Sequence, residues 1–134
     1  MSARRRFLDT NVLLYVLSAD EGKADRAEAL VAEGGVVSVQ VLNEFASVTL
    51  RKLGMSVAET RESLAAVRSS CEVVPVTADT HDRGLDLVER NGFAVYDAMI
   101  VASALLAGCD TLLSEDMQSG QVVEDRLTIT NPFR

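Results

Sequence analysis

The sequence predicts a three-layer α/β/α domain built on a short, mostly parallel sheet. Segments with helical spacing alternate with short apolar segments almost throughout the chain. The short segments are runs of Val, Leu and Phe without the period-two alternation of half-exposed strands, which indicates strands buried on both faces. Because parallel strands need long crossover connections, usually helices, this alternation predicts helices on both sides of the sheet.

Apolar spacing and turn residues place the elements in order. Gly54 and Gly108 each follow a segment of helical spacing, and Ser56 precedes one with Glu59 at the capping-box position. Pro75 suggests that its strand lies at an edge or ends there. The expected order is a strand at 5–8, a helix at about 11–18, a turn at 19–22, a helix at 23–33, a strand at 36–38, helices at about 40–53 and 56–69, a strand at 72–76, helices at about 77–90 and 98–107, a strand at 111–113, and one or two strands within 121–123 and 127–130.

The composition is that of an ordinary soluble protein with one core. Hydrophobic residues make up 48% and charged residues 25% of the 134 residues, which are expected to form a single domain, 1–134. No apolar run is long enough to cross a membrane, and the start lacks the apolar region of a signal peptide. Cys71 and Cys109 lie among apolar or small residues without metal-ligand spacing, so reduced thiols of a cytoplasmic protein are expected.

The formal net charge of −7 restricts how the chain could meet nucleic acid. It argues against binding through a broad basic surface. It does not exclude an enzyme that meets phosphates through bound cations, because clustered carboxylates are then part of the site.

A carboxylate interrupts apolar sequence near the start, in the stretch FLDTNVLL. Acids are rarely buried unless they are paired or bound to a metal, so Asp9 needs an explanation. One explanation is an ordinary N-cap between a strand and a helix. The other is a functional acid, since sites in parallel sheets lie beyond the carboxyl ends of the strands, and Asp9 follows such an end.

Three further acids also lie beside apolar segments. Glu44 is on the apolar stripe of its helix, although a long side chain there can still reach solvent. Asp97 is the only charge between residues 90 and 110; it opens a buried helix, where an acid also favours the positive helix end. Asp116 follows the strand at 111–113 and has an ordinary polar loop as its alternative.

One shared pocket accounts for the four acids more economically than four unrelated explanations. Oxygen ligands without His or Cys suit Mg²⁺ or Mn²⁺, which keep waters and substrate phosphates among their ligands. Such a site favours hydrolysis of phosphate esters.

Other site chemistries fit the sequence less well. His81, the only histidine, lies on a charged segment typical of a solvated helix face, which disfavours a Ser-His-Asp apparatus. The glycines form neither of the two common phosphate-binding patterns. An aspartyl-phosphate enzyme would need a second Asp at position 11, where the chain has Asn11.

These motifs together resemble the PIN-domain ribonucleases, and among them the toxins of VapBC-type toxin–antitoxin pairs. The resemblance covers nearly the whole chain, through FLDTNVLLY, the Glu of VLNEF and YDAMIVASALLAGCDTLLSEDM. It implies an endoribonuclease dependent on Mg²⁺ or Mn²⁺, a homodimer, and a small antitoxin protein as partner. Carried over by position, the family's acidic quartet falls on Asp9, Glu44, Asp97 and Asp116, and its supporting hydroxyls fall on Thr10 and Ser114.

A second hypothesis comes from a different class of function. The chain could be a catalytically inactive PIN-like module that acts through protein–protein contacts. The complete quartet favours the ribonuclease, because buried acids without a partner are costly and are seldom kept without a ligand.

Overall fold

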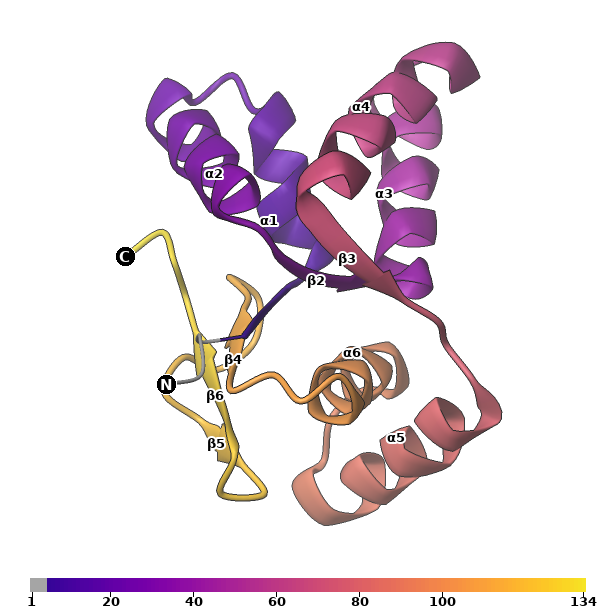
Figure 1. Cartoon of the computed structure of the whole chain (residues 1–134), viewed down its shortest axis with the longest axis vertical. Coiled ribbons are helices and arrows are strands. Elements are labelled where there is room, and N and C mark those ends of the chain that lie inside the picture. The colour runs from indigo at the N-terminus through magenta and orange to yellow at the C-terminus, as the bar shows by residue number, and fades with distance from the viewer. Residues whose placement is uncertain (1–4) are drawn as a thin grey trace.

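The computed structural model describes residues 5–134, so residues 1–4 of the expected domain lie outside it. A six-stranded sheet runs through the molecule in the order β3-β2-β1-β4-β6-β5 (Figure 1). Every neighbouring pair is parallel except β5 and β6. The strands are β1 (Arg6–Leu8), β2 (Gly35–Ser38), β3 (Cys71–Val74), β4 (Thr111–Leu113), β5 (Val122–Val123) and β6 (Leu127–Thr130).

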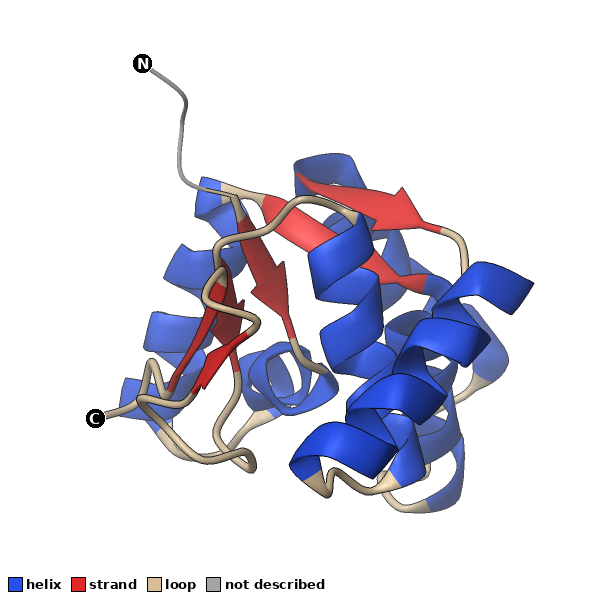
Figure 2. Ribbon diagram, turned by 90° about the horizontal axis from the view of Figure 1, so that it is seen from below, coloured by secondary structure: helices blue, strands red, loops and turns tan. Residues whose placement is uncertain are grey.

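Helices cover both faces of this sheet, which confirms the expected three-layer architecture. The strand order moves from β1 to β2 to β3 and then returns to β4 on the other side of β1, so right-handed crossovers place the later helices on the opposite face. In Figure 1, α1 to α4 lie on one side of the strands and α5 and α6 lie on the other, and Figure 2 shows helices around the strands from below. The helices are α1 (Thr10–Leu14), the 3-10 helix η1 (Tyr15–Leu17), α2 (Glu21–Glu33), α3 (Val39–Arg51), α4 (Val57–Ser70), α5 (Ala78–Asn91) and α6 (Val95–Leu106).

The core lies between the sheet and the helices, with α6 at its centre on one face. Residues 98–105 of α6 are all buried, as expected for a helix that is apolar all round. The capping box of Ser56 and Glu59 at the start of α4 is present as predicted. Strand β3 is an edge strand, as Pro75 suggests, and it ends at Val74, two residues before the expected end. Cys71 and Cys109 are buried free thiols.

Three further expected element boundaries are wrong. Helix α2 begins at Glu21 inside the expected turn, because the side chain of Asp20 accepts a hydrogen bond from the Lys23 amide and caps it. The expected helix at 11–18 divides into the short α1 and a 3-10 turn. Helix α6 begins at Val95, so Asp97 lies within its first turn and does not open it.

The register of the central strands brings the candidate residues to one edge of the sheet. Leu8 pairs with Leu113, and the Asp9 amide donates to the Leu113 carbonyl at 3.0 Å. Asp9 and the segment after β4 therefore leave the sheet side by side, as the alternation of strands and helices predicts. No helix within residues 5–134 is long and apolar enough to span a membrane.

Candidate acidic site at the carboxyl ends of β1 and β4

Asp9 is both a helix cap and a buried acid. It directly follows β1, and its carboxylate accepts a hydrogen bond from the Thr10 amide at 2.7 Å and another from the Ser114 hydroxyl at 2.8 Å. Only 5% of the residue is exposed. Burial raises the pKa of Asp9 from 3.8 to about 6, and the nearby charges of Glu44 and Asp97 add to the rise. The cap explanation is confirmed, yet it leaves a carboxylate whose charge is disfavoured.

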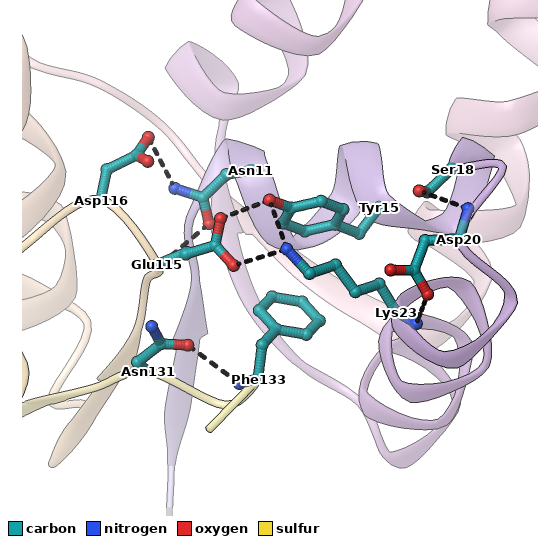
Figure 3. A network of polar contacts seen from close by, with 9 residues as sticks. All are labelled: Asn11, Tyr15, Ser18, Asp20, Lys23, Glu115, Asp116, Asn131 and Phe133. Atoms are coloured by element: carbon teal, nitrogen blue, oxygen red, sulfur yellow. Dashed lines mark hydrogen bonds and ion pairs between the residues drawn. The ribbon is translucent and has the colours of Figure 1, made fainter.

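Asn11 joins Asp9 to Asp116. Its side-chain amide donates to Oδ2 of Asp116 at 3.0 Å and lies 3.4 Å from Oδ2 of Asp9. Its side-chain carbonyl accepts the backbone amide of Glu115 at 3.2 Å, which attaches the loop after β4 to the start of α1. Figure 3 shows Asn11 between the helix and this loop, with Asp116 and Glu115 on its two sides. One amide side chain thus holds two of the predicted acids at one place.

Glu44 reaches the same place from α3. Its carboxylate Oε1 accepts a hydrogen bond from the Thr10 hydroxyl at 2.8 Å, and the residue is partly buried. Val41 and Phe45, on the same helix, are buried in the core, so Glu44 lies at the edge of the apolar stripe. The stripe position predicted from the sequence therefore directs this acid toward the end of β1.

Asp97 is linked to the other acids of the quartet through electrostatic repulsion alone. It lies in the first turn of α6, whose N-cap residue, Ala94, contributes no side-chain hydrogen bond. Burial raises the pKa of Asp97, and repulsion from Asp116 raises it further. Asp97 in turn raises the pKa of Asp9. The helix-start explanation holds for its position, and these repulsions show that it shares the electrostatic environment of the other acids.

The carboxylate oxygens of the four acids are the type of ligand that a hard divalent cation prefers. They are not arranged as a complete coordination site. Within residues 5–134, no group of three or more His, Cys, Asp and Glu side chains is arranged to hold an ion. Donors of the protein already engage the carboxylates, since the Asn11 amide contacts both Asp9 and Asp116. Carboxylate oxygens that repel one another gain from a shared cation, and Mg²⁺ needs only one or two of them directly.

Comparison with known proteins identifies the family. A family model described as the PIN domain matches residues 6–122. The chain belongs to the PIN domain family. No curated protein sequence matches it significantly.

Solved structures of similar fold include three bacterial proteins of low sequence identity. A toxin–antitoxin complex from Klebsiella pneumoniae has 17% identity and a TM-score of 0.71, covering 95% of this chain and 97% of that chain. VapC20 from Mycobacterium tuberculosis, described as a sarcin-ricin-loop cleaving toxin, has 21% identity and a TM-score of 0.64, covering 83% and 89%. FitAcB from Neisseria gonorrhoeae has 17% identity and a TM-score of 0.67, covering 96% and 98%. At these identities the likeness shows the fold.

A polar network that the sequence does not predict lies beside the acids of this PIN domain. Glu115 does not point toward the quartet: its carboxylate accepts from the Tyr15 hydroxyl and lies 3.3 Å from the Lys23 ammonium (Figure 3). The hydrogen bond from Tyr15 and the charge of Lys23 lower the pKa of Glu115. Lys23 also lies 4.5 Å from the centre of the Tyr15 ring. The network fastens α2 and η1 to the loop that carries Asp116.

The sequence gives only a weak indication that Asn11 belongs to the site. Asn11 lies two residues after Asp9, a separation compatible with a local side-chain contact. Its bond to Asp116 crosses 105 positions of the chain. A hydrogen bond between residues so far apart in the sequence becomes visible only in the folded structure.

Proposed function

We propose that this PIN domain is an endoribonuclease dependent on Mg²⁺ or Mn²⁺, and the toxin of a VapBC-type toxin–antitoxin pair. The observation that carries the proposal is the convergence of acids from four separate segments at one edge of the sheet. Hydrogen bonds link Asp9 to Asp116 through Asn11 and Glu44 to Thr10, and repulsion links Asp97 to Asp9 and Asp116. Membership of the family and the toxins among its structural relatives support the same activity.

Asp9, Glu44, Asp97 and Asp116 would hold the cation. When bound there, the cation would supply positive charge that draws the phosphodiester to an acidic protein and makes its phosphorus easier to attack. The four carboxylates would set the position of the scissile phosphate, because the ligands of a cation determine its place. No side chain needs to act as a covalent nucleophile, so water is the attacking group.

Thr10 and Ser114 act as positioning residues in this proposal. The Ser114 hydroxyl is buried and donates to Oδ2 of Asp9, which leaves that carboxylate one preferred orientation. The Thr10 hydroxyl does the same for Glu44. Carboxylates held in this way need less rearrangement when they bind a ligand.

A groove between the first four helices supports an antitoxin partner. It has a volume of about 580 Å³ and lies among α1, η1, α2, α3 and α4, and none of the four quartet acids lines it. Leu13, Phe45 and Met55 line its apolar part, and Glu28 and Glu62 are among its acidic residues. An amphipathic segment with a basic face would bury its apolar side there and pair with these acids.

Two finer expectations remain proposals. We place the interface of the homodimer implied by the family resemblance at the connection of α3 and α4, where Leu50, Leu53 and Val57 are between 41% and 55% exposed. Light scattering of the purified chain tests it. The two buried free thiols agree with a reducing compartment such as the cytoplasm.

The experiment that tests the activity is incubation of the purified chain with a structured RNA. Cleavage should require Mn²⁺ or Mg²⁺, stop with excess chelator and return when the metal is restored. Asp9→Asn should reduce the rate by orders of magnitude, while His81→Ala should leave it unchanged, because His81 is exposed on α5 and takes no part in the site. Equal cleavage by Asp9→Asn would reveal a contaminating nuclease and contradict the proposal.

A further inference from the structure

Tyr96 is the one exposed aromatic residue among those the structure describes. The chain has four Phe, two Tyr and no Trp, all at described positions. Phe7 and Phe45 are in the core, and Tyr15, Phe93 and Phe133 are partly buried. Tyr96 is 71% exposed, although it lies directly before Asp97. A large exposed ring contributes little to folding, so its place beside an acidic site needs another explanation.

The ring of Tyr96 forms one wall of a depression that also contains Glu44. The depression has a volume of about 420 Å³ and is lined by α3, the segment after β3 and the start of α6. Val39 and Val76 supply apolar surface, and Gln40 and Asn43 supply amides. We call it the Tyr96 pocket: Val39, Gln40, Asn43, Glu44, Ser47, Val76 and Tyr96.

A hydrogen bond fixes the backbone that carries the ring. The side-chain amide of Gln40 donates to the backbone carbonyl of Tyr96 at 3.2 Å, which joins the start of α6 to α3. The two helices that carry Asp97 and Glu44 are thus held at a set separation across the pocket. The backbone of Tyr96 is thus held in place, while most of the residue's surface is exposed.

We propose that the Tyr96 pocket receives an unpaired base of an RNA strand, stacked on the Tyr96 ring, from a nucleotide next to the bond that is cut. The inference rests on the proposed ribonuclease function and deepens it. An aromatic face beside amides is the chemistry that binds splayed-out bases, because the ring stacks and the amides contact the base edges. A strand that brings its phosphate to Glu44 must place a neighbouring nucleotide at or near this pocket.

The charge of the chain favours base contacts as the source of affinity. A net charge of −7 gives little attraction for the phosphate backbone. Stacking is available to every base and does not require a basic surface. A protein partner or a second copy could also cover an exposed tyrosine, but the amides and the candidate catalytic carboxylate in the pocket suit a nucleotide better.

Substitutions at Tyr96 separate stacking from apolar contact. Binding of a short, 5′-labelled, single-stranded RNA is measured by fluorescence anisotropy with Mn²⁺, in an Asp9→Asn background that does not cut it. Tyr96→Phe should keep the affinity within about twofold, whereas Tyr96→Leu and Tyr96→Ala should lower it by about 5- to 100-fold. Leu85→Ala, which removes another exposed apolar side chain on α5, should have no effect.

Kinetics of the unmodified site give a second readout. With Asp9 restored, Tyr96→Ala should raise KM more than it lowers kcat, because the base is held in both the ground state and the transition state. Tyr96→Phe should rescue the KM. The protein has no Trp, so stacking should also quench its tyrosine emission, and this quenching should be absent in Tyr96→Phe.

The outcomes distinguish this inference from the proposed function. Cleavage by the native chain with unchanged KM and affinity in Tyr96→Ala would overturn the base pocket alone. RNA binding that depends on Tyr96 without cleavage in any metal would support the pocket and contradict the ribonuclease. Absence of both binding and cleavage would overturn both. A native dimer that Tyr96→Ala converts to monomers without loss of RNA affinity would assign the ring to a protein interface and overturn the inference.

Discussion

At the scale of single residues, Asp9 is a buried carboxylate whose surroundings disfavour its charged form. Its pKa of about 6 lies above that of an unfolded chain, so the folded state binds the proton more tightly. The stability of the metal-free protein should therefore fall as the pH rises from about 4 to about 6, by at most about 3 kcal/mol. Urea denaturation at several pH values measures this loss.

Replacement of Asp9 should remove that pH dependence. Metal-free Asp9→Asn should be more stable than the native chain at pH 7.5, with the difference vanishing near pH 4, while its cleavage activity is lost. Asp25→Asn, a change of an exposed acid on α2, is the matched control and should leave the pH profile unaltered. If the free energy of unfolding changed with pH in the same way in the native chain and in Asp9→Asn, the ionisation of Asp9 would not destabilise the folded state, which would contradict the prediction.

Asn11 offers a second test at this scale. Asn11→Ala should lower the free energy of unfolding by about 1 to 2 kcal/mol, because it removes the donor shared by Asp9 and Asp116 and the acceptor of the Glu115 amide. Asn43→Ala removes the same atoms from an exposed position on α3 and should have little effect on stability. Equal stability of the two variants would mean that the bridge contributes nothing.

Residue identity predicts part of this site and misses the rest for a physical reason. An acid between apolar segments is visible in sequence because burial of charge is costly, and each acid of the quartet was predicted from that cost or its position. Asn11 and Tyr15 have uncharged side chains, so no cost of burying a charge marks them in the sequence. Their roles arise from hydrogen bonds to residues near position 115, which only the fold brings near.

At the scale of elements, two glycines should respond oppositely to the same substitution. A Cβ at Gly35 in β2 would lie 2.8 Å from the backbone carbonyl oxygen of Arg6, which cannot move without disturbing the pairing of β1 and β2. Gly35→Ala should therefore destabilise the protein by about 1 to 3 kcal/mol. Gly22→Ala in α2, where the nearest atom lies at 3.4 Å, should stabilise it by about 0.5 to 1 kcal/mol. Thermal unfolding of both variants checks the signs, and a shift of the same sign in both would contradict the close approach at Gly35.

The elements themselves were predicted well where one local signal dominates. The strand at 111–113 and the capped start of α4 match because an apolar run and a capping box are short-range features. The expected start of α2 is wrong because Gly22 favours a turn at 19–22. In the structure, the Asp20 cap stabilises a helix that begins at Glu21 and includes Gly22. The close packing that requires Gly35 is a contact between two strands, so the sequence does not reveal it, and the expected strand begins one residue later, at 36.

At the scale of the whole molecule, the groove among the first four helices should control the proposed ribonuclease through a partner. Met55→Arg places a positive charge in the groove and should prevent inhibition by a basic antitoxin, tested with the antitoxin that co-purifies with the native chain. Val122→Arg, at an exposed position on β5 outside the groove, should leave inhibition intact. Co-purification and residual cleavage report the result, and inhibition of Met55→Arg equal to that of the native complex would exclude the groove.

The central claim is that four acids form one site at which water hydrolyses RNA directly. Analysis of the product ends by mass spectrometry tests it most directly, with Asp9→Asn as the blank. Attack by water should leave a 5′-phosphate and a 3′-hydroxyl. A ribonuclease that uses the RNA 2′-hydroxyl instead leaves a 2′,3′-cyclic phosphate and usually needs a pair of histidines, which a chain with one His does not supply. We expect 5′-phosphate ends that form only with added Mg²⁺ or Mn²⁺. Cyclic-phosphate ends, or cleavage that persists in excess chelator, would contradict direct attack by water at this site.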